Sequence, residues 1–315
     1  MGGVSVATWL ASLPLTDPPT AVELQELRAD LDHSVTTSCR AVRAHLDVDL
    51  LPARVPKSRL ADLQRCERSA LARFRDVAPV VAGDAVLRGT ALDQFVAHQL
   101  TAGRVREPVA DLTSMLSAAG DWSSLAVLDD MDLVEAAALL EPMAAAVAAS
   151  WSGIDPAWAP RVECRASVVL ADGACVCSGV VDVELGGVTT DRPGVLVEVK
   201  SGRAAASHQD EVYLYALLVA LRDGVAPGVV ARWYPGADPT GLPVTLGVLE
   251  AAARRLADGV RRWFELLAGD PATEQAGAWC TWCPDLAVCP SASAEGAGVD
   301  ERTDLAHRAE DDDGW

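Results

Sequence analysis

The sequence predicts an α/β protein, a mixed sheet flanked by helices, with a mostly helical first half and a cysteine-rich module near the end. Apolar residues recur at helical spacing through much of the first half. Valine-rich runs broken by glycine and proline follow from Pro160, and helical and strand patterns then alternate. Half of the 315 residues are hydrophobic, which is enough to bury the core of one large domain.

The first half contains several helical patterns. Apolar residues such as Leu27 and Leu31 predict a helix within residues 21–47, which the prolines of residues 52–56 end. Ser58 is expected to cap a helix that runs to about Phe74 and contains Cys66. Further helices are expected at residues 86–101, 107–119 and 131–149.

The second half begins with strands. Turn-forming pairs at Asp172-Gly173, Gly186-Gly187 and Pro193-Gly194 separate the valine runs and predict three strands in a meander. A helix at residues 205–222, a strand at 228–234 and a helix at 247–267 are expected to follow.

The charge distribution limits the function. The formal net charge of −19 argues against indiscriminate binding to nucleic acid, because such affinity comes largely from Lys and Arg. Residues 293–315 carry eight acidic residues and predict a disordered tail. Basic residues cluster around Lys57 to Arg75 and at Arg254 to Arg262, and each cluster alone is interpreted as a solvated helix face. No basic segment leads into an apolar stretch and no run approaches the ~18 apolar residues of a membrane span, so we expect a cytoplasmic protein.

Two neighbouring strands carry a possible catalytic group. Glu198 and Lys200 alternate with Val197 and Val199, so they share one strand face. If the preceding strand is the neighbour in the sheet, Asp182 converges on the same point. Two carboxylates with open positions suit Mg²⁺ or Mn²⁺, and the lysine would orient a metal-bound water.

An ordinary surface ion pair is the alternative for Glu198 and Lys200. The composition weakens it, because 26 residues are Lys or Arg but only Lys57 and Lys200 are lysines. A lysine here is therefore not what the arginine-rich composition would produce.

This arrangement resembles the PD-(D/E)XK nuclease superfamily, in which an Asp on one strand precedes Glu-x-Lys on the next. The Gly179 to Asp182 segment and the Ser-Gly pair after Lys200 are similar to RecB-like members. The resemblance implies a restriction-endonuclease-like core and metal-dependent hydrolysis of DNA, with single-stranded ends as the substrate.

RecB-like proteins add a Gln-x-x-x-Tyr motif on the following helix. Gln209 with Tyr213 and Glu211 with Tyr215 both have this spacing, and only one pair can face the site. The run from Tyr215 to Leu218 favours the second pair, which puts Glu211 where the family has Gln. Both tyrosines could equally be core residues.

The branch also places a His four residues after a helical Gly. Gly89 is followed at that spacing by Asp93, which could bind metal through its carboxylate, whereas His98 lies five residues further on. This departure leaves room for a weakened or silent site.

Cys280, Cys283 and Cys289 have the spacing C-x2-C-x5-C, which can place three thiolates around one centre. Cys66 is the candidate fourth ligand, because its setting resembles AddB-type and CRISPR-adaptation nucleases. Those proteins hold a 4Fe-4S cluster with one cysteine before the core and three after it. From the residues alone, four thiolates could equally hold Zn²⁺, and Cys66 could be only a buried apolar residue. The other four cysteines are expected to be unliganded: Cys39, Cys164, Cys175 and Cys177.

We therefore expect a metal-dependent DNA nuclease, with a helicase as a possible partner. A catalytically weakened DNA-holding or scaffold subunit is the rival interpretation, which Asp93 and Glu211 favour. A metal-binding module unrelated to nucleic acid is a third. The expected division of the chain is a helical extension (1–57), a helical part with the first cluster cysteine (58–160), the catalytic core (161–270), the cysteine module (271–292) and the acidic tail (293–315).

Overall fold

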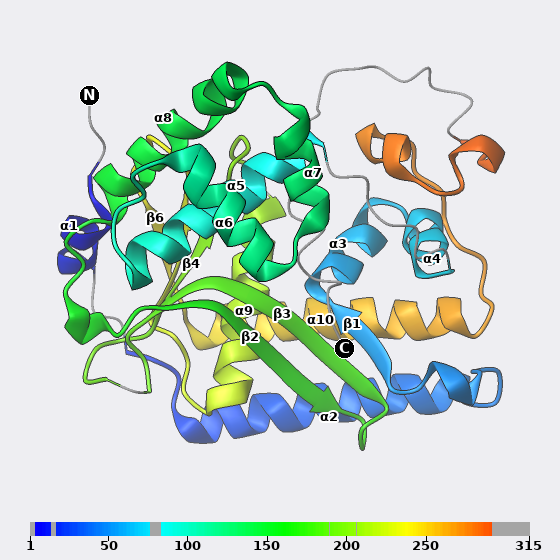
Figure 1. Cartoon of the computed structure of the whole chain (residues 1–315). Coiled ribbons are helices and arrows are strands. Elements are labelled where there is room, and N and C mark those ends of the chain that lie inside the picture. Colours follow the sequence, from blue (N-terminus) through cyan, green and yellow to red (C-terminus); the bar gives the residue numbers. More distant parts are fainter. Residues whose placement is uncertain (1–3, 14–16, 76–82, 189, 206, 292–315) are drawn as a thin grey trace.

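The computed structural model describes residues 4–13, 17–75, 83–188, 190–205 and 207–291. The predicted tail at 293–315 lies outside these ranges. The described chain is an α/β protein, in which a mixed sheet has helices packed on both faces (Figure 1), so the predicted fold class is confirmed at this level.

The sheet has six strands within the described residues. The three predicted strands form β2, β3 and β4, and each pairs antiparallel with the next. The fourth predicted strand is β5, parallel to β4. Two further strands, β1 parallel to β3 and β6 antiparallel to β5, were not predicted because each has only four residues and includes proline. The bounds are β1 Ala53–Pro56, β2 Arg161–Leu170, β3 Cys175–Leu185, β4 Val195–Val199, β5 Val229–Trp233 and β6 Thr240–Pro243.

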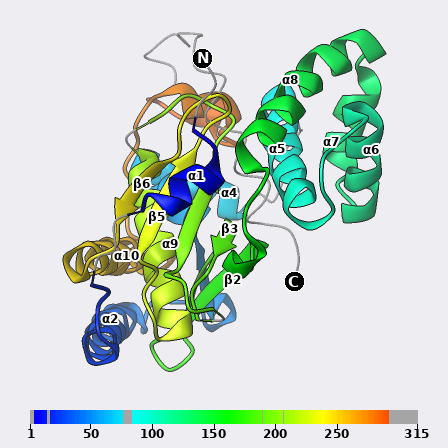
Figure 2. The same cartoon turned by 90° about the vertical axis from the view of Figure 1, so that its left-hand side faces the viewer.

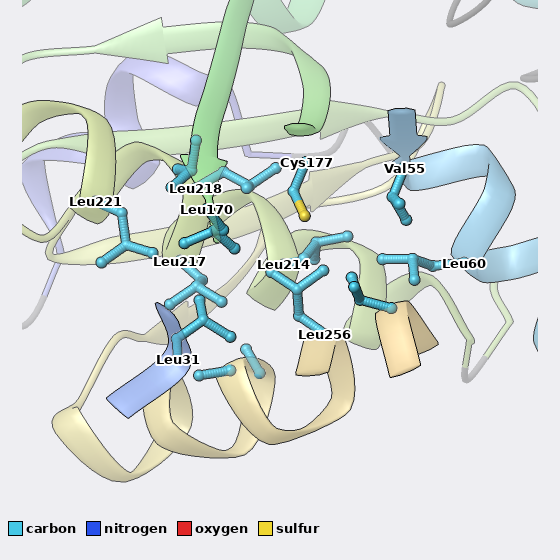
Figure 3. Close-up of a cluster of buried hydrophobic side chains, with 14 of the residues drawn as sticks. Leu31, Val55, Leu60, Leu170, Cys177, Leu214, Leu217, Leu218, Leu221 and Leu256 are labelled. Carbon is cyan, nitrogen blue, oxygen red and sulfur yellow. The ribbon is translucent and has the colours of Figure 1, made fainter. Parts of the chain in front are cut away.

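One face of the sheet is covered by α2 (Ala21–Val42), α9 (Ser207–Asp223) and α10 (Leu246–Leu267). Figure 3 shows leucines of all three helices, among them Leu31, Leu217 and Leu256, packed together and against the strands. These three helices confirm predicted ones.

The other face is covered by a group of helices that stands out from the sheet (Figure 2). Trp151 of this group meets Trp233 of β5 edge to face, with 5.5 Å between ring centroids. The sequence predicted three of these helices and missed α1 and α7. The group comprises α1 Val6–Ala11, α5 Asp84–Thr101, α6 Pro108–Ala119, α7 Trp122–Asp130 and α8 Leu133–Trp151.

Among the described helices, α8 alone is long and apolar enough to cross a membrane by length and composition. This corrects the expectation that no segment approaches that length. Its buried residues Ala136, Leu140, Ala144, Val147 and Trp151 follow one face at helical spacing. That face packs against α5 and α6, and 22% of the apolar window is buried.

The helix predicted from Ser58 to about Phe74 is two helices, α3 (Lys57–Arg65) and α4 (Glu67–Arg75). Cys66 lies between them with extended backbone angles, so the expectation that it lies inside a helix was wrong. Ser58 is not the N-cap, because Pro56 takes that position and already ends β1. Short 3-10 turns complete the described elements: Val48–Leu50, Pro156–Trp158, Ala278–Trp282 and Leu286–Val288.

Candidate active centre and cysteine site

The candidate active centre lies at a gap along one edge of β3. This edge pairs with β1 up to Ser178 and with β4 from Val183 onward, which leaves residues 179–182 between the two partners. β1 runs parallel to β3 and β4 runs antiparallel, so their carboxyl ends approach the gap from opposite directions. Residues that follow β1 and end β4 are thereby brought together.

Asp182 lies in this gap, opposite Glu198 if the β3–β4 register is extended by one residue beyond Val183↔Val197. The Val199 N–H donates to Asp182 Oδ2 at 2.6 Å. The predicted neighbourhood of Asp182 and Glu198 is therefore observed.

The strand geometry is irregular at Asp182. Val181 joins the core under α9, whereas Val183 joins the core under α5–α8, so the alternation of faces is interrupted between them. Glu163, which faces Asp182 in the β2–β3 register, has a left-handed φ of 50°. Local irregularities of this kind re-aim side chains and are common beside functional sites.

Lys200 is buried among carboxylates. Its side chain is 1% exposed, and Nζ lies 2.7 Å from Glu198 Oε1 and 3.0 Å from Glu211 Oε2. Val197 and Val199 face the opposite core, as strand alternation predicted. The pair of Glu198 and Lys200 is therefore not an ordinary surface ion pair.

Lys57 reaches the same carboxylates from the other strand end. Its Nζ lies 3.3 Å from Glu198 Oε1, 3.7 Å from Glu211 Oε2 and 4.8 Å from the centre of the Tyr215 ring. The residue is only 8% exposed, so its interpretation as part of a solvated helix face was wrong. The sequence signal that could have identified Lys57 is the rarity of lysine, because both lysines of the chain, Lys57 and Lys200, lie at this one site.

The charges of the group stabilise one another. Burial alone would raise the pKa of Glu211, but the ammoniums of Lys200 and Lys57 lower this pKa to about 2. Burial alone would lower the pKa of Lys200, but Glu198 and the other carboxylates outweigh it and raise this pKa. Both residues are therefore charged at neutral pH.

One oxygen of Glu198 remains available. Oε1 accepts from both lysines, whereas Oε2 is buried and has no hydrogen-bond partner in the described part of the chain. A buried carboxylate oxygen in this state is costly unless a ligand satisfies it.

Helix α9 presents the second of the two overlapping pairs to the site. Glu211 contacts Lys200, and Tyr215 is 2% exposed beneath Lys57. The two residues of the first pair bind each other, because Gln209 Nε2 donates to the Tyr213 hydroxyl at 3.2 Å.

Helix α5 carries Asp93 beside β2. The carboxylate oxygens of Asp93 are buried, and the adjacent Gln94 donates to Glu163 at 3.4 Å. Since Glu163 belongs to β2, α5 runs alongside β2, the strand that neighbours β3 and its Asp182. His98 lies in the last turn of α5.

The four cysteines predicted to act together line one pocket. Cys66, Cys280, Cys283 and Cys289 surround it with Trp279, although Cys66 is more than 200 residues from the others in the sequence. None of these four cysteines forms a disulfide within the described residues.

No three His, Cys, Asp or Glu side chains in the described ranges surround a position that could hold a metal ion. At the strand ends, Glu198 and Glu211 are bound by lysines, and Asp182 accepts from the Val199 N–H. At the cysteines, the sulfurs line a pocket and do not converge on one point. A tetrahedral zinc ion would hold its sulfurs roughly 3.8 Å apart, given Zn–S bonds of ~2.3 Å, whereas an iron-sulfur cluster needs a wider spacing.

Glu67, the residue after Cys66, binds the last part of α10 and the segment that follows it. Glu67 makes a bidentate pair with Arg262 at 2.6 and 2.7 Å and accepts from the Thr273 N–H at 2.7 Å. The hydrogen bond from Arg262, which outweighs the opposing effect of burial, lowers the pKa of Glu67 to about 2.

Arginines of α4 extend these contacts to the cysteine module. Arg68 pairs with Glu274 at 2.6 Å and with Asp285 at 2.9 Å. Arg73 donates to the Trp282 carbonyl at 3.2 Å. These contacts join α4 to the segment that carries Cys280, Cys283 and Cys289.

The remaining cysteines belong to the core or its edge. Cys175 and Cys177 are buried with their sulfurs 3.8 Å apart, and Cys39 joins the same hydrophobic core. Burial raises the pKa of the partly buried Cys164 thiol to about 11. No metal role is indicated for these four.

Comparison with known proteins leaves the family of the chain open. No protein-family model matches it, and no curated protein matches it. Among solved structures, the chain is similar to one titled "Crystal structure of SSO0001", with 13% sequence identity and a TM-score of 0.33. That alignment covers 82% of this chain and 95% of the other.

Proposed function

We propose that this chain is a metal-dependent DNA nuclease with a PD-(D/E)XK core of the RecB-like branch. The observation that carries the proposal is the meeting of Asp182, Glu198 and Lys200 at the gap along β3. The aspartate hydrogen-bonds the strand that carries the other two residues, and the lysine is buried against the glutamate. Surface ion pairs do not bury a lysine in this way, because desolvation costs more than an isolated pair returns.

The proposed cation would be held by at least two carboxylates, with its other positions left for water and a substrate phosphate, as Mg²⁺ often is. Glu198 Oε2 is a buried oxygen without a hydrogen-bond partner among the described residues, and Asp182 supplies a second carboxylate, with Asp93 on α5 as a third proposed ligand. When bound, Mg²⁺ or Mn²⁺ would acidify a water molecule and offset charge on the scissile phosphate. Lys200 fixes Glu198 through Oε1, and Glu211 in turn holds Lys200. The Lys57 ammonium lies over the face of the Tyr215 ring.

The test is incubation of purified protein with end-labelled linear DNA and Mn²⁺, with and without EDTA. Single-stranded and duplex substrates are compared, because we propose single-stranded ends as the substrate. Glu198→Gln should abolish cleavage, whereas Glu250→Gln removes an exposed carboxylate of α10 and should have no effect. Cleavage that persists in EDTA or in Glu198→Gln would reject the proposal.

We also propose that the four-cysteine pocket holds a 4Fe-4S cluster. The proposed donor set is four cysteines outside any disulfide that line one pocket, and the Gly277 N–H donates to Cys280 Sγ at 3.4 Å. Hydrogen bonds of this kind to ligand sulfurs tune the reduction potential of a cluster. Protein purified without oxygen should be brown and contain iron. Colourless protein with one zinc per chain would show that the pocket holds a zinc ion and not a cluster.

A second candidate function is a DNA-holding subunit without cleavage. Asp93 and Glu211, which depart from the family pattern, favour it, and the net charge of −19 suggests that a helicase partner supplies DNA affinity. Binding of DNA without any cleavage in Mn²⁺ would support this candidate over the nuclease. In either case we propose a cytoplasmic protein.

A further inference from the structure

The proposed nuclease site contains a second lysine that its motif does not require. Lys57 and Lys200 share the same two acceptors, Glu198 Oε1 and Glu211 Oε2. Lys57 follows β1 directly, more than 140 residues before Lys200 in the sequence. Its presence therefore depends on the pairing of β1 with β3.

Local stability does not explain a lysine at position 57. It is the first residue of α3, where the positive end of the helix dipole disfavours a cation, and Pro56 offers no side-chain cap. Burial of an ammonium adds a desolvation cost. Conflicts of this kind between local preference and observed residue are expected where a residue serves function.

The charge balance indicates what that function is. Asp182, Glu198 and Glu211 carry one more charge than the two lysines neutralise. A bound divalent cation would reverse the sign and leave the group with a single positive charge, which matches one phosphodiester. Without Lys57 the same group would be neutral and would no longer attract a phosphate.

The two lysines also differ in access. Lys200 is enclosed, with 1% of its side chain exposed. Lys57 has 10% of its side chain exposed and lies on the Tyr215 ring. The side chain of Lys57 is therefore the more exposed of the two.

From these observations we infer that Lys57 is a substrate-binding residue of this centre, whose positive charge draws the DNA phosphate once the divalent cation is bound. The inference rests on the proposed nuclease function. It assigns Lys57 to phosphate binding and not to metal binding, because its ammonium would repel the cation.

Two substitutions and a control test this role. Lys57→Met removes the charge and keeps the length, and Lys57→Arg keeps the charge. Arg54→Met removes an exposed positive charge from β1, three residues away. Cleavage of a labelled single-stranded oligonucleotide is measured over a range of Mn²⁺ concentrations, and thermal unfolding is followed with and without Mn²⁺.

We expect Lys57→Met to lower kcat/KM on the order of 10–100-fold, as loss of a charge-assisted hydrogen bond does. The Mn²⁺ concentration for half-maximal activity should stay the same or fall, and Mn²⁺ should raise the melting temperature of Lys57→Met at least as much as that of wild type. Lys57→Arg should recover most of the rate, and Arg54→Met should match wild type. If Lys57→Met does not fold, Lys57→Gln replaces it in the same comparison.

Failure of the Lys57 role can be distinguished from failure of the proposed nuclease function. Wild-type protein that neither binds nor cleaves DNA rejects the nuclease proposal and the Lys57 role with it. Active wild type with equally active Lys57→Met overturns the Lys57 role alone. A raised Mn²⁺ requirement in Lys57→Met, not corrected in Lys57→Arg, would make Lys57 a residue that positions Glu198 and overturn phosphate binding.

Discussion

Gly179 is the residue of β3 at which a single methyl group should disturb the centre. A Cβ at this position would lie 2.6 Å from Cε1 and 3.2 Å from Cδ1 of Tyr215, and 3.7 Å from a methyl of Leu218. The first distance is shorter than ordinary carbon contacts and the second is tighter than most of them. The ring cannot retreat easily because Tyr215 is 2% exposed. Gly179→Ala should therefore displace Tyr215, on which Lys57 rests.

The expected magnitude follows from overpacking. One extra methyl group in a closed core costs about 1–3 kcal/mol of unfolding free energy, and the upper part of this range applies because the clash is with a ring. Gly179→Ala should also reduce DNA cleavage, since the displaced ring moves Lys57. Urea unfolding followed by circular dichroism measures the first effect, and the Mn²⁺ cleavage assay measures the second.

A double-mutant cycle isolates the clash. In a Tyr215→Leu background the ring is absent, so Gly179→Ala should lower the free energy of unfolding by less than about 0.5 kcal/mol. Equal losses in both backgrounds, or a stable Gly179→Ala protein with full activity, would refute the assigned packing.

Three further predictions concern other parts of the molecule. The pKa of Glu67 is lowered from its ordinary value of 4.5 to about 2, so its pair with Arg262 stabilises fully above pH 4.5 and is lost as pH falls from 4.5 through 2. Glu67→Gln should cost about 1–2 kcal/mol of unfolding free energy at pH 7, and this cost should shrink below pH 4.5 and vanish below pH 2; a pH-independent cost in acid unfolding experiments would contradict this. Cys66→Ala should lose the brown colour and solubility together, because a cluster that joins Cys66 to Cys280 closes a long loop and stabilises the folded protein by about 5 kcal/mol in the chain-entropy model. A soluble, metal-free Cys66→Ala protein would show that no metal group joins these cysteines. Asp93→His should keep or improve Mn²⁺-dependent cleavage and His98→Ala should change it little, whereas a strong loss confined to His98→Ala would show that α5 is misassigned.

The parts of the fold with strong local patterns were predictable from the sequence. Long amphipathic helices such as α2 and α10, and the valine-rich strands β2 to β4, are specified by their own periodicity. β1 was not predictable, because a four-residue strand between prolines has little pattern and exists through its pairing with β3. The break at Cys66 was missed for a similar reason, since the helical pattern continues on both sides of it.

The candidate site was predictable where its residues are close in sequence. Glu198 and Lys200 are placed by strand alternation, and Asp182 by the pairing of adjacent strands. Lys57 could not be placed, because its proximity to Glu198 depends on the parallel pairing of β1 with β3. The unused oxygen of Glu198 is likewise a property of the assembled site.

The most direct test of the central claim is the single-turnover cleavage rate of Lys200→Ala in saturating Mn²⁺. The control is Arg203→Ala, which removes an exposed cation three residues later. Lys200→Ala should fold, as judged by circular dichroism, and lose at least roughly 10²–10³-fold in rate, because it removes charge stabilisation needed in the transition state. Arg203→Ala should cleave at the wild-type rate. Undiminished cleavage by Lys200→Ala would contradict the assignment of this centre as the nuclease site.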